Sequence, residues 1–341
     1  MNYVIIKGNF RVVKHSPDGD SLKFQAKKAS NWKKIVTVYH ELFAKKIEEG
    51  QGVVQLRLQG IDALETHYTP SKILAPKTIG SKTSKKATLP DRNNYKQPEK
   101  YGNLATEKLL EILGLQNVVW SRYSIKSVDI KKGKTLKTYS NKNTDPIEGY
   151  IIVNDVERKG RPISFAFAGK TRLRDGGKIT KEKLQKILKD SINYQLLAEG
   201  LVYPYFFHTL SAKLRNVLAD AVKDAQKKKL NIWLDDQTER GIKLNKFSQI
   251  TGEHIILPYL FRRLIKHQYL RLMQEYWKAL EGNKAHQPKA ESLFLKSFFD
   301  DTNPYVFVID TKDFKRLDEI VVISRNKIRM STHPGNIVFL S

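Results

Sequence analysis

The chain contains no cysteine in its 341 residues, so neither a disulfide bond nor a thiolate metal site can form. It also contains no apolar run near the roughly 18–20 residues that a membrane-spanning helix needs, and we expect no membrane partner. Residues 1–10 lack the basic start, apolar stretch and small-residue cleavage site of a signal peptide. We therefore expect a cytoplasmic protein, or a secreted one if a leader has been removed.

Several common catalytic motifs are missing as well. The sequence has no phosphate-binding P-loop, no Ser/His/Asp order typical of a serine hydrolase, and no zinc-binding motif. Its eight histidines form no recognisable pair of metal ligands. His67, two residues after Glu65, fits a turn or surface position better than a ligand position. These absences argue against the function classes that depend on such motifs.

Acidic residues are scarce relative to basic ones. There are 35 Asp and Glu residues against 61 Lys and Arg residues, which gives a formal net charge of +26. A charge this large repels itself, and a polyanionic partner relieves the repulsion. Nucleic acid is the leading candidate, and a merely solubilising basic surface is the alternative. The length predicts two domains.

Alternating apolar residues predict strands that end at turns rich in charge. The first strand pair, over residues 4–24, turns at Asp18-Gly19-Asp20, and a strand over 53–58 leads into Asp62. Residues 69–100 have no apolar periodicity and predict a long loop, whose lysines either follow a nucleic-acid backbone or are simply solvated. The other expected elements are helices at 27–50, 103–113, 180–199, 211–229, 254–280 and 290–299, strands at 118–120, 150–153, 305–309, 320–323 and 337–340, and a basic hairpin tip at 131–134.

The most informative pattern combines carboxylates with an arginine. Its members are Asp18, Asp20, Arg57, Asp62 and Glu65. Carboxylate oxygens hold hard divalent cations such as calcium or magnesium, and a guanidinium clamps a phosphate. A further carboxylate can orient or deprotonate a water. These are the components of metal-assisted phosphodiester hydrolysis. Structural ion pairs of Arg57 are the alternative, although crowded carboxylates without a metal repel one another.

Four segments occur in a characteristic order along the chain. They are residues 18–23, residues 57–66, the dipeptide Gly160-Arg161 at the start of a strand, and residues 225–233 at the end of a helix. Together they resemble the staphylococcal (thermo)nuclease family of calcium-dependent nucleases. The resemblance covers roughly residues 3–235, with insertions near 27–50, 69–100 and 131–148. Residues beyond about 240 lie outside it.

The resemblance implies a fold and a mechanism. The implied fold is α+β, a five-stranded OB-fold barrel with three helices. Asp20, Asp62 and the backbone carbonyl of Ala63 are the implied Ca²⁺ ligands, with Mg²⁺ as the alternative ion. Glu65 is the implied water-activating carboxylate. Arg57 and Arg161 are the implied phosphate clamps. Cleavage of DNA or RNA would leave a 3′-phosphate and a 5′-hydroxyl.

The sequence also departs from the family pattern. Ala63 and Leu64 stand where Thr and Pro are usual, which loosens the metal loop. Lys159 replaces an aromatic residue before the Gly-Arg element and favours backbone contacts over base stacking. Phe206 and His208 are the candidates for the nucleotide pocket, with core packing as the alternative for the aromatic ring. Asp18 lies near the implied metal or only stabilises its own turn.

We therefore expect a nuclease domain over residues 1–239 and a separate α+β module of unknown function over residues 240–341. The expected activity is metal-dependent cleavage of nucleic acid with little sequence preference. One alternative is a non-catalytic nucleic-acid-binding barrel. Another is a nuclease effector controlled by its C-terminal module through a protein partner or self-association.

Overall fold

The computed structural model describes residues 3–70, 95–122, 124–281, 291–300 and 302–340. By contacts the chain divides into two units. One contains Met1–Ala63 and Lys100–Leu234, and the other contains Leu64–Glu99 and Asp235–Leu340. The second unit thus combines residues 64–99, which the sequence analysis assigns to the first domain, with the C-terminal region. Most of the expected loop at 69–100 lies outside the described residues. None of the helices in the described ranges has both the length and the apolar character required to span a bilayer.

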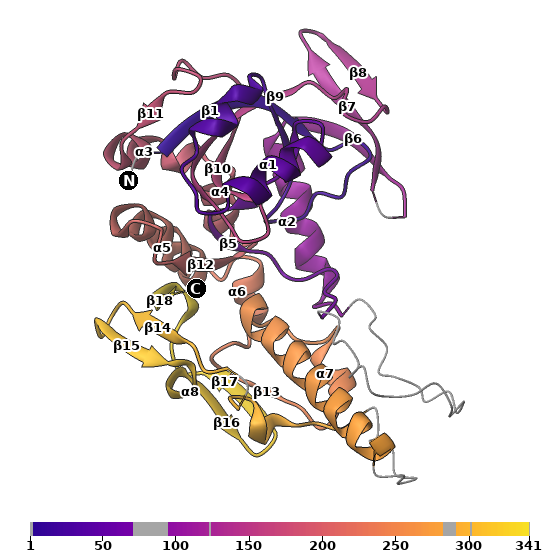
Figure 1. The fold of residues 1–341 in the computed structure, drawn as a ribbon, viewed down its shortest axis with the longest axis vertical. Coiled ribbons are helices and arrows are strands. Elements are labelled where there is room, and N and C mark those ends of the chain that lie inside the picture. The colour runs from indigo at the N-terminus through magenta and orange to yellow at the C-terminus, as the bar shows by residue number, and fades with distance from the viewer. Residues whose placement is uncertain (1–2, 71–94, 123, 282–290, 301, 341) are drawn as a thin grey trace. The chain divides into compact units, whose positions relative to one another are not determined.

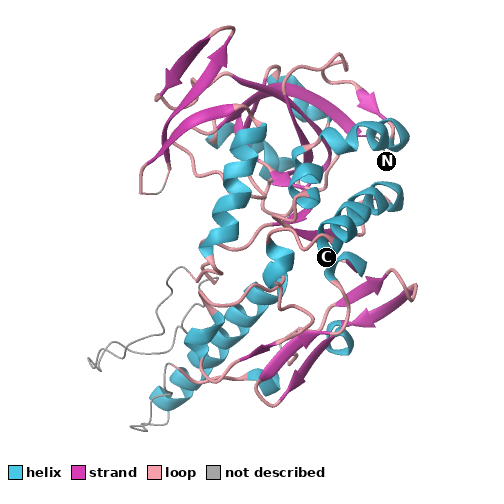
Figure 2. Ribbon diagram, turned by 180° about the vertical axis from the view of Figure 1, so that it is seen from behind, coloured by secondary structure: helices cyan, strands magenta, loops and turns pink. Residues whose placement is uncertain are grey.

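The first unit is built on a curled sheet (Figures 1 and 2). Its path joins strands in the order β3-β2-β1-β9-β10-β4, and β11 adds to β1. Neighbouring strands are antiparallel except β10 and β4, which are parallel. The strands are β1 (Tyr3–Arg11), β2 (Lys23–Ala26), β3 (Val53–Gln55), β4 (Arg57–Leu58), β9 (Ile147–Val156), β10 (Pro162–Ala168) and β11 (Lys178–Ile179).

The two ends of this path are close in sequence. Strands β3 and β4 lie at opposite ends of the strand order, yet only Leu56 separates them. The Leu56 amide donates to Leu22 O (2.8 Å), which keeps this residue bonded to the neighbouring strand segment. The unit is therefore a mixed α+β fold with a curled half-barrel sheet, and it is compatible with an OB-like fold.

Helices of the first unit form where apolar residues recur at helical spacing. They are α1 (His40–Glu49), α2 (Glu99–Ile112), α3 (Lys181–Ile187), α4 (Ile192–Ala198), α5 (Ala212–Lys227) and α6 (Ile232–Asp235), with short 3-10 turns η1 (Ala29–Lys34) and η2 (Leu188–Asp190). The expected helix over 27–50 is interrupted, because residues 35–39 carry β-branched side chains that disfavour helix. The expected helix over 180–199 breaks at Ser191, whose hydroxyl accepts from the Tyr194 amide (3.1 Å) and caps α4.

A three-stranded sheet extends from the first unit (Figure 1). It consists of β6 (Leu115–Trp120), β7 (Ile125–Lys132) and β8 (Thr135–Tyr139), in that order. The turn between β7 and β8 is the basic hairpin tip expected at 131–134. At the other end of β7, Ile125 bridges to Val13, five residues before Asp18. The hairpin is thereby attached beside the chain segment that leads into the acidic turn.

The second unit contains two small sheets and a long helix. One sheet joins β13 (Ile242–Lys243), β17 (Lys327–Met330) and β16 (Val321–Ser324), and α7 (Pro258–Glu281) lies beside it in both views (Figures 1 and 2). The other pairs β14 (Tyr305–Val308) with β15 (Asp313–Arg316) and β18 (Ile337–Phe339). Shorter elements are η3 (Phe247–Ile250), η4 (Leu295–Ser297), α8 (Leu317–Ile320) and η5 (Pro334–Asn336). Of the helix expected at 290–299, the described residues form only η4.

Candidate functional site

Arg57 joins the two carboxylates that were expected to bind metal. Its Nη1 donates to Asp20 Oδ2, and its Nη2 donates to Asp62 Oδ1 at 2.9 Å. The same Nη2 lies 3.4 Å from Ile61 O. The Asp62 side chain is fully buried, and the Arg57 side chain is only 15% exposed. A guanidinium bonded to two carboxylates restricts the orientation of all three groups, and removing any one of them would leave a buried charge without its partner.

Short strands determine where these side chains lie. Arg57 begins β4, and Asp62 ends β5 (Gly60–Asp62), which pairs with β12 (Tyr203–Phe207). The backbone of Asp20 accepts a hydrogen bond from the Leu58 amide (3.0 Å). The arginine and both carboxylates are therefore positioned by hydrogen-bonded backbone rather than by free loops.

The acidic turn requires glycine at its centre. A Cβ on Gly19 would lie 2.7 Å from Ala105 Cβ and 2.9 Å from Ala63 Cβ, closer than such atoms approach. Asp18 and Ser21 close the turn with two backbone hydrogen bonds, and Asp18 Oδ1 accepts from the Gly19 amide (2.8 Å). Asp18 thus has the turn-stabilising contact that was considered as the alternative to a place near the metal. The small side chain of Ala63 fits this close approach between turn and helix α2.

The donor set suits a hard divalent cation. Two carboxylates, from Asp20 and Asp62, and the backbone carbonyl of Ala63 are oxygen ligands of the type that calcium and magnesium prefer. Within the described residues, no three His, Cys, Asp or Glu side chains cluster closely enough to hold a metal. A cation at this place would therefore depend on two carboxylates, on carbonyl oxygen and on water, and it would compete with Arg57 for the same carboxylates.

Glu65 lies in the second unit and has an arginine partner there. Arg262 Nη1 of helix α7 donates to Glu65 Oε1 at 2.6 Å, with side-chain exposures of 21% and 18%. The backbone of Glu65 is bonded on both sides to Gln97, through Gln97 N to Glu65 O (2.8 Å) and Glu65 N to Gln97 Oε1 (3.2 Å). Sequence reasoning missed Arg262, because it lies 197 residues from Glu65 and outside the family resemblance.

Arg161 follows a tight turn at the start of β10. Gly160 has φ of +77°, a conformation that glycine adopts without strain, and its amide donates to Glu157 O (2.8 Å). The Arg161 Nε donates to Glu157 Oε1, and Lys159 in the same turn is exposed. In the parallel pairing of β10 with β4, Ile163 lies opposite Arg57. Arg161 is therefore two residues, roughly 7 Å along the strand direction, from the neighbour of Arg57.

The last three residues of β12 alternate between partly exposed and buried positions. Phe206 is fully buried, so its ring is a core residue, as the alternative for this position held. The rings of Tyr205 and Phe207 lie on the opposite face at 4.7 Å between centroids, and both are partly exposed. Arg57 Cζ lies 5.6 Å from the centroid of Tyr205, and His208 is exposed beyond the strand. Tyr205 thus lies beside Arg57, and the alternation of faces over 205–207 was the signal that could have found it.

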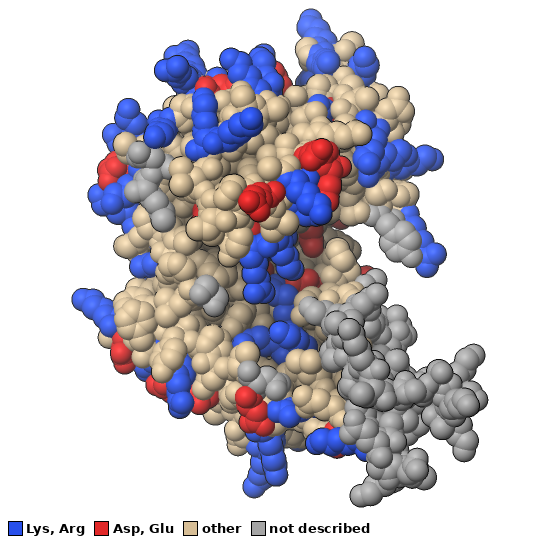
Figure 3. All heavy atoms as spheres, viewed as in Figure 1, with Lys and Arg blue, Asp and Glu red and all other residues tan. Residues whose placement is uncertain are grey.

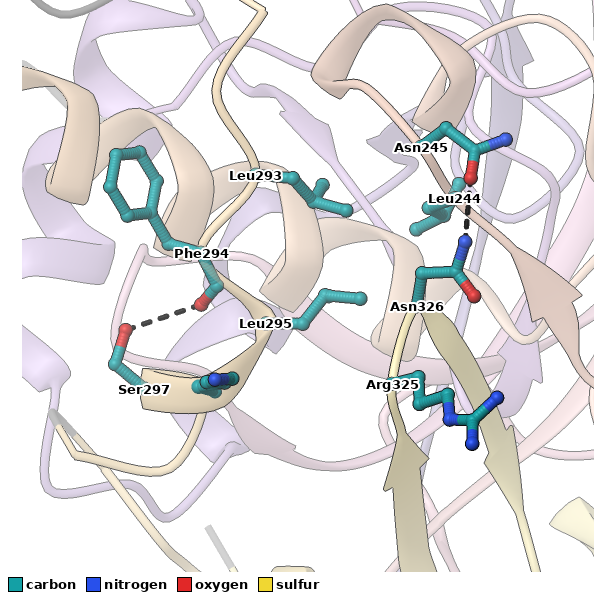
Figure 4. A pocket seen from close by; sticks show the side chains of 9 residues that line it. Leu244, Asn245, Leu293, Phe294, Leu295, Ser297, Arg325 and Asn326 are labelled. Carbon is teal, nitrogen blue, oxygen red and sulfur yellow. Dashed lines mark hydrogen bonds between the residues drawn. The ribbon is translucent and has the colours of Figure 1, made fainter.

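A separate pocket of about 440 Å³ lies in the second unit (Figure 4). An Asn326 Nδ2 to Asn245 Oδ1 hydrogen bond (2.5 Å) spans one side, and the Ser297 hydroxyl is bonded to Phe294 O. The lining residues are Leu244, Asn245, Leu293, Phe294, Leu295, Lys296, Ser297, Arg325 and Asn326. None of them is acidic and none belongs to the Arg57 cluster, so this pocket does not carry the expected chemistry.

The cluster of Arg57, Asp20 and Asp62 is therefore the best-defined candidate site in the described part of the chain. The sequence matches no protein-family model, and it matches no curated protein.

Proposed function

We propose that this protein is a metal-dependent phosphodiester hydrolase that cleaves DNA, RNA or both, on a fold like that of the staphylococcal nucleases. The observation that carries the proposal is Arg57 bridging Asp20 and Asp62 at the junction of β4 and β5. Carboxylates for a cation and a guanidinium for a phosphate are brought together there by short, well-bonded strands. A purely structural ion pair does not need a second carboxylate on the same guanidinium.

The strand order supports an OB-type barrel. If β3 and β4 are two parts of one strand, the path β1-β2-β3/β4-β10-β9 returns to β1 and closes five strands. The parallel pair of β10 and β4 would be the closing contact. Barrels of this type bind nucleic-acid strands across one face. Helices α2, α4 and α5 are the candidates for the three helices of the family fold.

Each residue then has a chemical role. Asp20, Asp62 and the Ala63 carbonyl would hold Ca²⁺, with Mg²⁺ as the alternative, and the bound ion would offset negative charge on the phosphate. Arg57 would exchange a carboxylate for a phosphate oxygen, and Arg161 would leave Glu157 to bind the phosphate from another side. Both cations stabilise the charge that develops in the transition state.

The hydrolytic step uses Glu65 as the base. Glu65 takes a proton from water, and the water oxygen bonds to phosphorus. The bond from phosphorus to the 5′ oxygen breaks, and that oxygen leaves as a hydroxyl after receiving a proton. The products are a 3′-phosphate and a 5′-hydroxyl.

The three-stranded sheet β6-β7-β8 supports nucleic acid as the substrate. Trp120 is 45% exposed, and Lys132 and Lys137 lie over the Tyr139 ring, with Nζ 5.8 and 5.6 Å from its centroid. Asp129 is the one acidic residue over 115–139, and its carboxylate accepts bonds from Thr138 and Asn117. Basic side chains stand out at this hairpin (Figure 3). The lysines of β7, β8 and their turn are Lys126, Lys131, Lys132, Lys134 and Lys137.

Lysines beside an exposed aromatic ring suit phosphates and stacked bases without reading a sequence. Partial exposure of Tyr205 beside Arg57 adds a second ring near the candidate site, and Lys159 adds an exposed cation. Little sequence preference is therefore the expected behaviour.

A non-catalytic nucleic-acid-binding module is the second candidate. The observation in its favour is that both arginines expected to clamp phosphate are already paired with carboxylates, Arg57 with Asp20 and Asp62, and Arg161 with Glu157. Such pairs could simply stabilise a binding barrel.

Cleavage assays distinguish the two candidates. Single-stranded DNA, double-stranded DNA and RNA are each incubated with calcium, magnesium or chelator, using the natural chain and Glu65→Gln. Metal-dependent cleavage that leaves 3′-phosphates and is lost in Glu65→Gln is expected. Tight, metal-independent binding without cleavage would refute the hydrolase and leave the binding module.

A further inference from the structure

The segment that carries Glu65 belongs to the second unit. Besides its two bonds to Glu65, Gln97 donates through Nε2 to the buried Ile256 carbonyl (2.7 Å). Tyr68 exchanges two backbone hydrogen bonds with Tyr95 (2.6 and 2.8 Å). The Tyr68 ring also makes an edge contact with Phe261 of α7, at 6.4 Å between centroids. Residues 65–68 are therefore attached to the C-terminal part of the chain through backbone and side chains.

Arg262 completes this attachment at the carboxylate itself. It follows Phe261 on α7, whose first turn is held by the Leu257 amide donating to the buried Thr238 hydroxyl (2.9 Å). The bond from Arg262 Nη1 to Glu65 Oε1 is short and charge-assisted, and both side chains are about four-fifths buried. A charged bond in such a place restricts the carboxylate to few rotamers.

We propose that Arg262, on helix α7, is a positioning residue for Glu65. The inference rests on the proposed function, because it assigns Arg262 a role through the carboxylate that activates water. It gives the C-terminal region a role through Glu65. In this role Arg262 fixes the direction of the group that takes the proton.

Mispositioning a general base slows the chemical step more than it weakens substrate binding. Replacing Arg262 by Ala releases the Glu65 carboxylate, while the phosphate and the nucleic-acid strand keep their own contacts. Arg262→Lys keeps the positive charge but loses the planar guanidinium, so it should cleave faster than Arg262→Ala and more slowly than the natural chain.

The test measures kcat and KM for cleavage of an oligonucleotide with calcium by Arg262→Ala, Arg262→Lys and a control. Arg271→Ala is the matched control, because Arg271 is another ion-paired α7 arginine with a comparable 22% side-chain exposure. Arg262→Ala should lower kcat about 10–100-fold while KM changes less than about threefold. Arg271→Ala should keep the natural kcat. Thermal unfolding shows that each variant is folded.

A double variant separates positioning from general destabilisation. In the Glu65→Gln background, single-turnover assays at high enzyme concentration measure the residual rate, and Arg262→Ala should lower it no further, since the group it positions is already disabled. If Arg262→Ala lowers the rate equally in both backgrounds, the inference is overturned. A natural or increased kcat in Arg262→Ala would also overturn it, and an increase would identify an inhibitory contact. If Glu65→Gln abolishes cleavage but Arg262→Ala does not lower it, the proposed function stands and this inference alone fails. A natural chain that cleaves nothing overturns both.

Discussion

At the residue scale, the proposed mechanism gives Arg57 two roles that compete for the same guanidinium. In the structure Arg57 bridges Asp20 and Asp62, and in the proposed mechanism it binds a phosphate. A cation on the carboxylates and a phosphate on the guanidinium satisfy both partners at once. In the proposed mechanism, the three groups therefore separate when substrate and metal bind together.

Arg57→Ala should lower kcat about 10²–10³-fold, because transition-state charge loses its closest cation. Affinity for nucleic acid should change less than about threefold, because many lysines still hold the backbone. Arg11→Ala is the control, since Arg11 is an arginine with 11% side-chain exposure beside the buried Asp145 and outside the site. Single-turnover cleavage and fluorescence anisotropy measure the two effects. A collapse of affinity with unchanged single-turnover rate would show that Arg57 only binds.

His15 makes the stability of the folded chain fall as the pH is lowered. Burial, the largest cause, lowers the pKa of His15, and nearby Lys23 and Lys142 lower it further against the opposing bond to Asn143 and the charge of Asp145. The unfolded chain therefore takes up the proton first as pH falls below about 6.5, and stability is lost from there down to the lower folded pKa.

Between about pH 7.5 and 5.5, the Tm should fall in the natural chain and fall less in His15→Gln. His40→Gln is the control, because His40 is exposed. Its Tm should fall as much as that of the natural chain. Burial also lowers the pKa of His254, so part of the fall remains in His15→Gln. Differential scanning calorimetry measures the Tm at each pH. An identical fall in His15→Gln and the natural chain would contradict this assignment.

At the element scale, the β7–β8 hairpin carries many lysines for its size. Lys131, Lys132 and Lys134 flank the Gly133 turn. Asp129 is the acidic residue in the hairpin sequence. Lysines on a projecting hairpin contact phosphates without ordering bases, so they add affinity in proportion to the phosphates they reach.

Replacing Lys131, Lys132 and Lys134 by Glu should weaken binding of single-stranded DNA by Glu65→Gln protein. The slope of log affinity against log salt should flatten by roughly two to three, because each lost phosphate contact removes about 0.7–0.9. Replacing the exposed Lys181, Lys183 and Lys186 of α3 by Glu changes the net charge by the same amount and serves as the control. Anisotropy at several salt concentrations measures both. Equal losses in the two triple variants would mean that the hairpin has no special contact.

Elements were predictable where one local pattern dominated. The strand alternation placed Asp20, Arg57 and Asp62 at strand ends, and the Asp-Gly-Asp turn and the tip at 131–134 lie where expected. The helix break at Ser191 was missed because apolar spacing outweighed the capping signal. Phe206 was taken for a pocket residue because the register of β12 follows from its pairing with β5.

The bond between Glu65 and Arg262 was beyond sequence reasoning for a different reason. An ion pair between distant segments leaves no periodicity in either of them, and the identity of the partner follows only from tertiary packing. The same holds for Gln97 and Ile256, whose bond ties the middle of the chain to its C-terminal part.

At the scale of the whole molecule, the interleaved units predict what truncation does. A chain of residues 1–239 keeps the curled sheet but removes Thr251, Ile256 and Arg262, which bond residues 64–70 and 95–99. Backbone amides of Tyr68 and Gln97 should exchange hydrogen much faster in residues 1–239 than in the full chain. Cleavage should fall because Glu65 is released.

Hydrogen exchange followed by mass spectrometry measures the first effect, and β1 and β9 serve as the internal control. Unchanged protection of Tyr68 and Gln97 in residues 1–239 would show that this segment does not need the C-terminal region. Full activity of the truncated chain would contradict a task for that region at the site.

The discontinuous second unit also constrains how the protein is made. Residues 64–99 leave the ribosome before residues 100–234, yet their partners begin at Asp235. At 5–20 residues per second, the segment with Glu65 waits roughly ten to thirty seconds for those partners. The curled sheet has all its strands by then, but Glu65 acquires Arg262 only near the end of translation. Under the proposed function, a nascent chain would therefore gain its activity last, after the surface proposed to bind nucleic acid has already formed beside the messenger that encodes it.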